Sequence, residues 1–268
     1  MIAVSLLILV PTLVPAPAAP AGSPRDEAET PPVVTIDGDE HQRYFLHAPA
    51  GGTEAPEDGW KLLVVMPGGD GGEDFAPFVG RIRANALDDE WLVAQLVAPV
   101  WSEGQAKSNV WPTKRNPWPE MGFCCEELFA AVVADVAKER ELDPRYLFTL
   151  AWSSSGTLAY TLALERESGV TGTFIAMSVY SPDLLPSLKP AKGRHFHLLH
   201  SPQDFIPIAM AEKAREELEK KGAEVSYATY EGGHGWRGDV YGMMRTGFDW
   251  LEQKAKKAKP PKPLKRSR

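Results

Sequence analysis

The chain has 268 residues, of which 43% are hydrophobic and 24% are charged, ordinary values for a globular protein that allow one large domain or two small ones. A formal net charge of −7 argues against a nucleic-acid-binding protein. The only cysteines, Cys124 and Cys125, are neighbours, and two adjacent thiols cannot link distant parts of the chain, which excludes a disulfide framework.

The first 32 residues precede the first predicted strand. Residues 2–14 are apolar but too few to span a bilayer comfortably, and Ala16-Pro17-Ala18 then resembles a cleavage site, so we expect a signal peptide over residues 1–18. The segment has no Lys or Arg at its start, which leaves an uncleaved membrane anchor or a misassigned start as alternatives. Residues 19–32 are rich in Pro, Ala and acids and predict a linker. A cleaved signal implies a secreted or periplasmic protein without a stable membrane span.

Strands and helices are predicted to alternate from residue 33 to residue 256. Two short strands come first, at 33–36 and 43–47, and the turn signal Asp37-Gly38-Asp39 favours their antiparallel pairing. Apolar runs then predict buried strands at 61–66, 91–98, 146–152, 171–178, 196–200 and 225–230, with helices at 75–87, 126–140, 154–166, 207–221 and 237–256. This order implies one α/β domain with a doubly wound, mostly parallel sheet and antiparallel N-terminal strands. No large insertion follows the sixth strand, so we expect no large cap domain.

A run of three serines directly follows the predicted strand at 146–152, in Ala151-Trp152-Ser153-Ser154-Ser155-Gly156. A nucleophilic serine on a sharp strand-to-helix turn needs small residues two positions before and after it, because strand and helix approach closely there. Ser153 has an alanine and a serine at these positions. Ser154 would place a tryptophan at the first, and Ser155 would place a threonine at the second. The pattern favours Ser153 as the nucleophile, with a serine-rich helix cap as the alternative.

A candidate acid and a candidate base follow two later strands. Asp204 comes shortly after the strand at 196–200, and His234 follows the strand at 225–230 between glycines. The carboxyl ends of parallel strands form the ligand-binding edge of such a sheet. A serine hydroxyl needs a histidine base that a carboxylate orients. Ser153, Asp204 and His234 are therefore the candidate catalytic residues, and Asp183 is the alternative acid.

Over residues 33–256 the chain resembles the α/β-hydrolase superfamily, in which the nucleophile, the acid and the histidine follow one another in this order. It is most similar to small secreted esterases of the feruloyl esterase and polyhydroxyalkanoate depolymerase kind, and to dienelactone-hydrolase-like and phospholipase/carboxylesterase proteins. The resemblance implies an oxyanion hole formed by the backbone amides of Ser154 and Gly69. Ala151 and Ser155 replace the usual glycines, and Pro67 stands where many members have histidine. The motifs therefore identify the superfamily and not the substrate.

Other motifs point to packing rather than chemistry. His195 and His197 alternate on a strand but lack a Cys or Glu partner of clear spacing, so we expect structural histidines, no metal and no cofactor. The glycine-rich loop at 67–72 lacks the Lys-Ser or Lys-Thr pair of a phosphate-binding loop. The long segment at 101–123 holds three tryptophans, which either line a substrate pocket or pack the segment against the body: Trp101, Trp111 and Trp118.

The C-terminal end is basic while the rest of the chain is acidic. Residues 254–268 carry eight Lys or Arg residues and no acid, which leaves −15 on the remainder. The tail at 257–268 is predicted to be a solvated end, with binding to anionic envelope polymers as the alternative.

These features predict a serine hydrolase, in the first place a carboxylic ester hydrolase that acts on a small-molecule or polymer-borne ester through an acyl-enzyme. A prolyl-oligopeptidase-like peptidase shares the fold and the triad but usually carries a propeller domain, for which this chain has no room. A non-catalytic binding protein that retained the fold is the third hypothesis. No nucleic-acid partner is expected, and the sequence does not indicate an oligomeric state.

Overall fold

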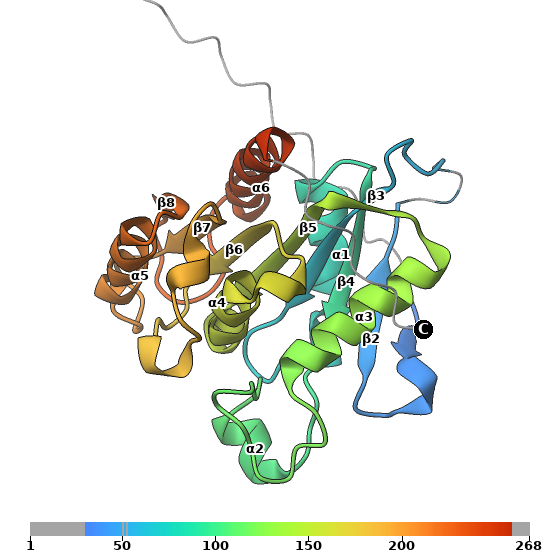
Figure 1. Ribbon diagram of the computed structural model, residues 1–268, viewed down its shortest axis with the longest axis horizontal. Coiled ribbons are helices and arrows are strands. Elements are labelled where there is room, and N and C mark those ends of the chain that lie inside the picture. The colour runs from blue at the N-terminus through green and yellow to red at the C-terminus, as the bar shows by residue number, and fades with distance from the viewer. Residues whose placement is uncertain (1–29, 50, 52, 259–268) are drawn as a thin grey trace, which may run out of the picture.

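The computed structural model describes residues 30–49, 51 and 53–258. Within these residues, eight strands form one sheet (Figure 1). The predicted signal peptide, most of the linker and most of the basic tail lie outside these residues. The strand order across the sheet is β1-β2-β4-β3-β5-β6-β7-β8. In chain order the strands are β1 (Val33–Thr35), β2 (Arg43–His47), β3 (Trp60–Met66), β4 (Trp91–Leu96), β5 (Leu142–Trp152), β6 (Gly172–Ala176), β7 (His195–His200) and β8 (Glu224–Thr229).

The pairing confirms a mostly parallel sheet with antiparallel strands at its N-terminal edge. β2 pairs antiparallel with both β1 and β4. All neighbours from β4 to β8 pair in parallel. The carboxyl ends of these six strands therefore point to one edge of the sheet, which is where loops of an open α/β sheet bind ligands.

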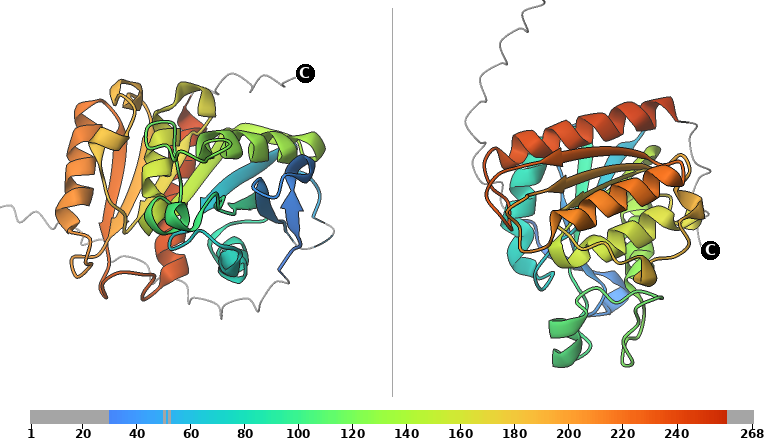
Figure 2. Two further views of the ribbon diagram at one scale, coloured as in Figure 1. Left: turned by 90° about the horizontal axis from the view of Figure 1, so that it is seen from below. Right: turned by 90° about the vertical axis from the view of Figure 1, so that its left-hand side faces the viewer.

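Helices cover both faces of the sheet (Figure 2). They are α1 (Ala76–Ala86), α2 (Glu103–Ser108), α3 (Cys125–Glu139), α4 (Gly156–Leu164), α5 (Ile208–Lys220) and α6 (Val240–Lys257). α1 and α6 pack together on one face, and α3, α4 and α5 lie on the other. In the described ranges, no helix combines the length and the apolar composition that a membrane span requires.

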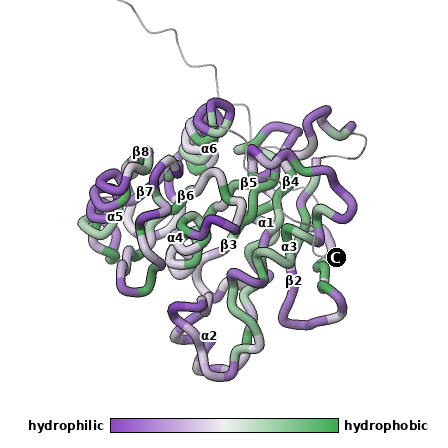
Figure 3. Tube along the Cα trace, in the orientation of Figure 1, coloured by the Kyte–Doolittle hydropathy of each residue, from purple (hydrophilic) through white to green (hydrophobic). Residues whose placement is uncertain are grey.

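The central strand β3 shows why the sheet needs two layers of helices. All seven of its residues are buried. Leu62 and Val64 face the core under α3 and α4, whereas Leu63 and Val65 face the core under α1 and α6. Alternate side chains of a strand point to opposite faces, so a continuous apolar run must be covered on both. Figure 3 shows hydrophobic residues concentrated in these central strands.

Most predicted elements differ from the structure by one to three residues at their ends, and two larger differences occur. β5 begins at Leu142, four residues before the apolar run, because Leu142 pairs with Trp60 ahead of an irregularity in the ladder. The short helix α2 lies within the segment at 101–123, where no periodicity predicted one. Its six residues are capped by Ser102, whose hydroxyl accepts the amide of Gln105 at 3.2 Å.

The connection after β6 and the position of the two cysteines are as the sequence predicts. Residues 177–194, all of them described, join β6 to β7 with two 3-10 turns and hold no cap domain. Both cysteines lie buried and free at the start of α3, where Cys124 is the N-cap and its amide donates to the Glu127 carboxylate at 3.0 Å.

Candidate active site

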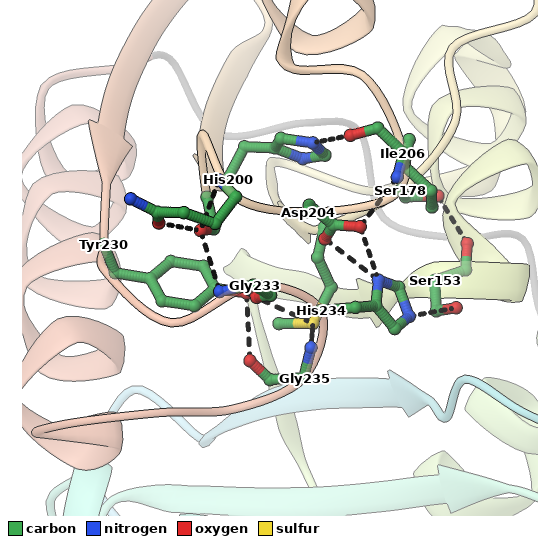
Figure 4. Close-up of polar contacts among 12 residues, drawn as sticks. Ser153, Ser178, His200, Asp204, Ile206, Tyr230, Gly233, His234 and Gly235 are labelled. Atoms are coloured by element: carbon green, nitrogen blue, oxygen red, sulfur yellow. Dashed lines mark hydrogen bonds and ion pairs between the residues drawn. The ribbon is translucent and has the colours of Figure 1, made fainter.

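The three predicted catalytic residues meet at the carboxyl edge of the sheet (Figure 4). Ser153 follows β5, Asp204 follows β7 and His234 follows β8. Nε2 of His234 lies 3.0 Å from Oγ of Ser153, and Nδ1 lies 2.9 Å from each carboxylate oxygen of Asp204. An ionised carboxylate only accepts hydrogen bonds, so Nδ1 carries the proton and Nε2 is free to accept the serine proton. The arrangement can therefore activate the hydroxyl of Ser153.

Ser153 is the first residue of the 3-10 helix η3 (Ser153–Ser155), at a strained turn directly after β5. Its φ is 56°, in the left-handed region, which costs a non-glycine residue about 1–2 kcal/mol. Ser155, where the superfamily usually has glycine, is fully buried. Its hydroxyl accepts a hydrogen bond from the amide of Trp152 at 3.1 Å and donates one to the carbonyl of Met66 at 2.6 Å. This hydroxyl joins the ends of β3 and β5, so a serine is accommodated at the position and stabilises it.

The tightest approach lies one residue after Ser155. A Cβ added to Gly156 would lie 2.0 Å from Oγ of Ser178. The Ser178 hydroxyl donates to the carbonyl of Ser153 at 2.5 Å, which fixes the backbone of Ser153 from the loop after β6. Ser178 does not stand out in the sequence, because it contacts the site through a backbone carbonyl.

The loop after β7 holds the Asp204 carboxylate away from water. The Asp204 side chain is 0% exposed, and its Oδ1 accepts the amide of Ile206 at 2.8 Å. The carbonyl of Ile206 in turn accepts from Nε2 of the buried His200 at 2.9 Å. His200 therefore supports the acid loop without touching the imidazole of His234. The alternative acid, Asp183, lies exposed in the 3-10 helix η5 (Pro182–Leu184).

The loop after β8 is fixed through its backbone. The Tyr230 hydroxyl lies 3.0 Å from the carbonyl of Gly233 and 2.9 Å from that of Gly235, the glycines on either side of the histidine. Burial, and then the nearby Asp204 charge, raises the pKa of Tyr230 to about 12, so its hydroxyl stays protonated at neutral pH. Ser201 of the acid loop accepts the amide of Gly233 at 3.1 Å. Neither Tyr230 nor Ser201 stands out in the sequence, since each acts on backbone atoms.

The glycine-rich loop after β3 lies beside the three-serine turn. A turn closes between the amide of Gly71 and the carbonyl of Gly68 at 3.0 Å, with Gly69 exposed at φ 62°. The Ser154 hydroxyl donates to the carbonyl of Gly69 at 2.9 Å. Gly68 packs so closely on Trp152 that an added Cβ would lie 2.6 Å from the indole. The two residues expected to form an oxyanion hole are thus in direct contact.

The tryptophans of the segment at 101–123 pack that segment rather than leave it open. Trp111 is buried, and its indole N–H donates to the carbonyl of Pro67 at 3.1 Å, at the base of the glycine-rich loop. The Trp118 indole donates to Ser102 at 3.1 Å, within the segment itself. Trp101 stacks on His41 with ring centroids 4.2 Å apart. These contacts favour the packing alternative over a tryptophan-lined pocket.

His195 and His197, on β7, have structural partners. Nδ1 of His195 lies 3.2 Å from the carbonyl of Thr171, and Nδ1 of His197 lies 3.0 Å from the hydroxyl of Ser226. Burial lowers the pKa of His197 to about 4, so the ring is neutral at neutral pH. Across the part of the chain that the structure describes, no three His, Cys, Asp or Glu residues group as metal ligands.

The structure is similar to solved esterases. An esterase from the Planctomycetes species Thermogutta terrifontis, with propionate bound, superposes with a TM-score of 0.61 at 15% identity, over 84% of this chain and 94% of that one. The α/β hydrolase MGS-M1 from a Medee basin deep-sea metagenome library gives 0.58 at 16% identity, over 84% and 97%. A Bacillus cereus carboxylesterase gives 0.53 at 17% identity, over 79% and 93%.

No protein-family model matches the sequence, and no curated protein is significantly similar to it. The structural likeness and the sheet order together establish that the chain has the α/β-hydrolase fold, as the sequence predicted.

Proposed function

We propose that this protein is a serine hydrolase that cleaves carboxylic esters through an acyl-enzyme. The observation that carries the proposal is the chain of contacts from Asp204 through His234 to Ser153, with 2.9 Å on the acid side and 3.0 Å on the serine side. A serine-rich helix cap does not require a buried carboxylate and a histidine at these distances, whereas a nucleophile does.

In the first half of the reaction, Oγ of Ser153 attacks the ester carbonyl while Nε2 of His234 takes the serine proton. The buried Asp204 carboxylate orients the imidazole and stabilises its positive charge. His234 then returns the proton to the alcohol oxygen as the carbon–oxygen bond of the ester breaks. In the second half, the same imidazole activates a water that cleaves the acyl-enzyme and regenerates Ser153.

The negative charge on the carbonyl oxygen requires two hydrogen-bond donors near Ser153. We assign these donors to the amides of Ser154 and Gly69. Ser154 is the second residue of η3, and the first amides of a helix have no partner within it. Gly69 lies exposed on the neighbouring loop, with the Phe75 ring 3.5 Å from the position of an added Cβ. The contact between these residues supports the assignment, because it holds the two loops together next to Ser153.

An ester substrate is favoured over a peptide because the similar solved structures named above are called esterases or, in one instance, an α/β hydrolase. The test is hydrolysis of p-nitrophenyl acetate and of a matched p-nitroanilide by the purified protein, with the Ser153→Ala variant as control. We expect turnover of the ester only, and none in the variant. Faster cleavage of the anilide would favour the peptidase alternative, and no turnover of either compound would favour the non-catalytic protein.

A further inference from the structure

A phenylalanine stands exposed against the candidate catalytic histidine. Phe205 is 76% exposed, and its ring centroid lies 4.4 Å from that of the His234 imidazole, with the planes tilted by 42°. Among the described residues, only three large hydrophobic side chains are exposed, and Phe205 is the most exposed of them: Val33, Val100 and Phe205. Single exposed hydrophobic residues are common on protein surfaces, but this one touches the group proposed to move the proton.

Hydrogen bonds fix the backbone that carries this ring. Phe205 stands between Asp204, whose carboxylate binds His234, and Ile206, whose amide donates to that carboxylate at 2.8 Å. The carbonyl of Ile206 is held by the buried His200. The backbone on both sides of the phenylalanine is therefore fixed, while its ring remains open to solvent.

The reaction itself decides which part of an ester would meet the ring, so the inference rests on the proposed function. His234 must reach the alcohol oxygen in order to protonate it, which places the alcohol portion on the histidine side of Ser153. The carbonyl oxygen faces the other way, toward the amides of Gly69 and Ser154. A ring in contact with His234 accordingly borders the alcohol portion rather than the acyl chain.

We propose that Phe205 determines specificity by binding the alcohol portion of the substrate, and that the site prefers esters of apolar, ring-bearing alcohols. Such a group would shield the exposed face of the Phe205 ring from solvent. Offset or edge-to-face contact between the two aromatic rings would add to the binding free energy. A short aliphatic alcohol would leave most of that face exposed and gain little.

The test compares kcat/KM for benzyl acetate and ethyl acetate, which differ in the alcohol, and for ethyl butyrate, which differs from ethyl acetate in the acyl chain. We expect Phe205→Ala to lower kcat/KM for benzyl acetate about 10-fold, the scale of a lost apolar contact in a substrate site, and to change the two ethyl esters less than about 2-fold. Phe205→Leu should retain part of the preference. Val100→Ala, at the other strongly exposed hydrophobic residue, is the matched control and should leave the benzyl-to-ethyl ratio unchanged.

An equal loss on all three esters would overturn the inference, since the ring would then act on His234 alone. An unchanged benzyl-to-ethyl ratio in Phe205→Ala would overturn it as well. Failure of the wild-type protein to hydrolyse any ester would instead refute the proposed function, and the inference with it. Retained fluorophosphonate labelling of Ser153 in Phe205→Ala would show that a changed ratio does not come from misfolding.

Discussion

The hydrogen bond from the Ser154 hydroxyl to the carbonyl of Gly69, 2.9 Å long, links the two loops that carry the proposed oxyanion amides. Ser154→Ala removes this bond and leaves the Ser154 amide in place. A hydrogen bond between neutral groups contributes about 0.5–1.5 kcal/mol, which corresponds to roughly a 2- to 12-fold change in rate at 1.36 kcal/mol per tenfold. We therefore expect kcat for p-nitrophenyl acetate to fall by roughly 2- to 12-fold with little change in KM. Ser154→Thr, which keeps a hydroxyl, should recover part of the loss.

The size of the effect distinguishes three roles for Ser154. Loss of a whole oxyanion donor costs about 100- to 1000-fold in kcat, and loss of a nucleophile costs on the order of a million-fold. A million-fold loss in Ser154→Ala, with fluorophosphonate labelling abolished, would mean that Ser154 and not Ser153 is the nucleophile. An unchanged kcat would mean that the bond to Gly69 does not hold the loop in its active geometry.

Three further predictions concern the acid, the turn and the buried histidines. Asp204→Asn should lower kcat about 10,000-fold while the fold is retained, because an amide no longer selects the imidazole tautomer; steady-state kinetics with circular dichroism will check this, and a loss below tenfold would contradict it. Gly156→Ala should reduce the free energy of unfolding by about 1–3 kcal/mol, since the added Cβ would collide with the Ser178 hydroxyl; urea unfolding measures the loss, and an unchanged midpoint would refute the collision. Burial lowers the pKa of His47 and His197 from 6.5 to about 4. Both imidazoles are therefore protonated below pH 6.5 in the unfolded chain, but only below about pH 4 in the folded protein. The contribution of these neutral histidines to the free energy of unfolding is therefore fully present above pH 6.5. It is lost as the pH falls toward 4, by up to about 3 kcal/mol for each histidine. His197→Gln should lose less stability than the wild type between pH 8 and pH 5 in urea titrations; an equal loss would contradict this origin.

The fold was predictable because the buried strands have continuous apolar sequences. A run such as β3, buried on every residue, belongs only in a sheet covered on both faces. Two features without a recognisable pattern were not predictable. The six residues of α2 are too few to show helical periodicity, and β5 extends upstream of its apolar run through pairing with Trp60 alone.

The site was predictable where a residue type carries the chemistry and not where the backbone does. Ser153, Asp204 and His234 are chemically distinctive and follow strands whose ends share one edge. Ser178 and Tyr230 act on carbonyl groups of neighbouring loops, and any sequence offers many such hydroxyls. The tryptophans of the segment at 101–123 suited a pocket and a packed loop equally well until their partners were known.

The most direct test of the account is the mass of the protein after reaction with a fluorophosphonate, followed by peptide mapping. We expect one adduct, on the side-chain Oγ of Ser153, in the wild type and in Ser155→Ala, and no adduct in Ser153→Ala. An adduct that persists in Ser153→Ala, or that maps to Ser154 in the wild type, would contradict the assignment of the nucleophile and the mechanism built on it.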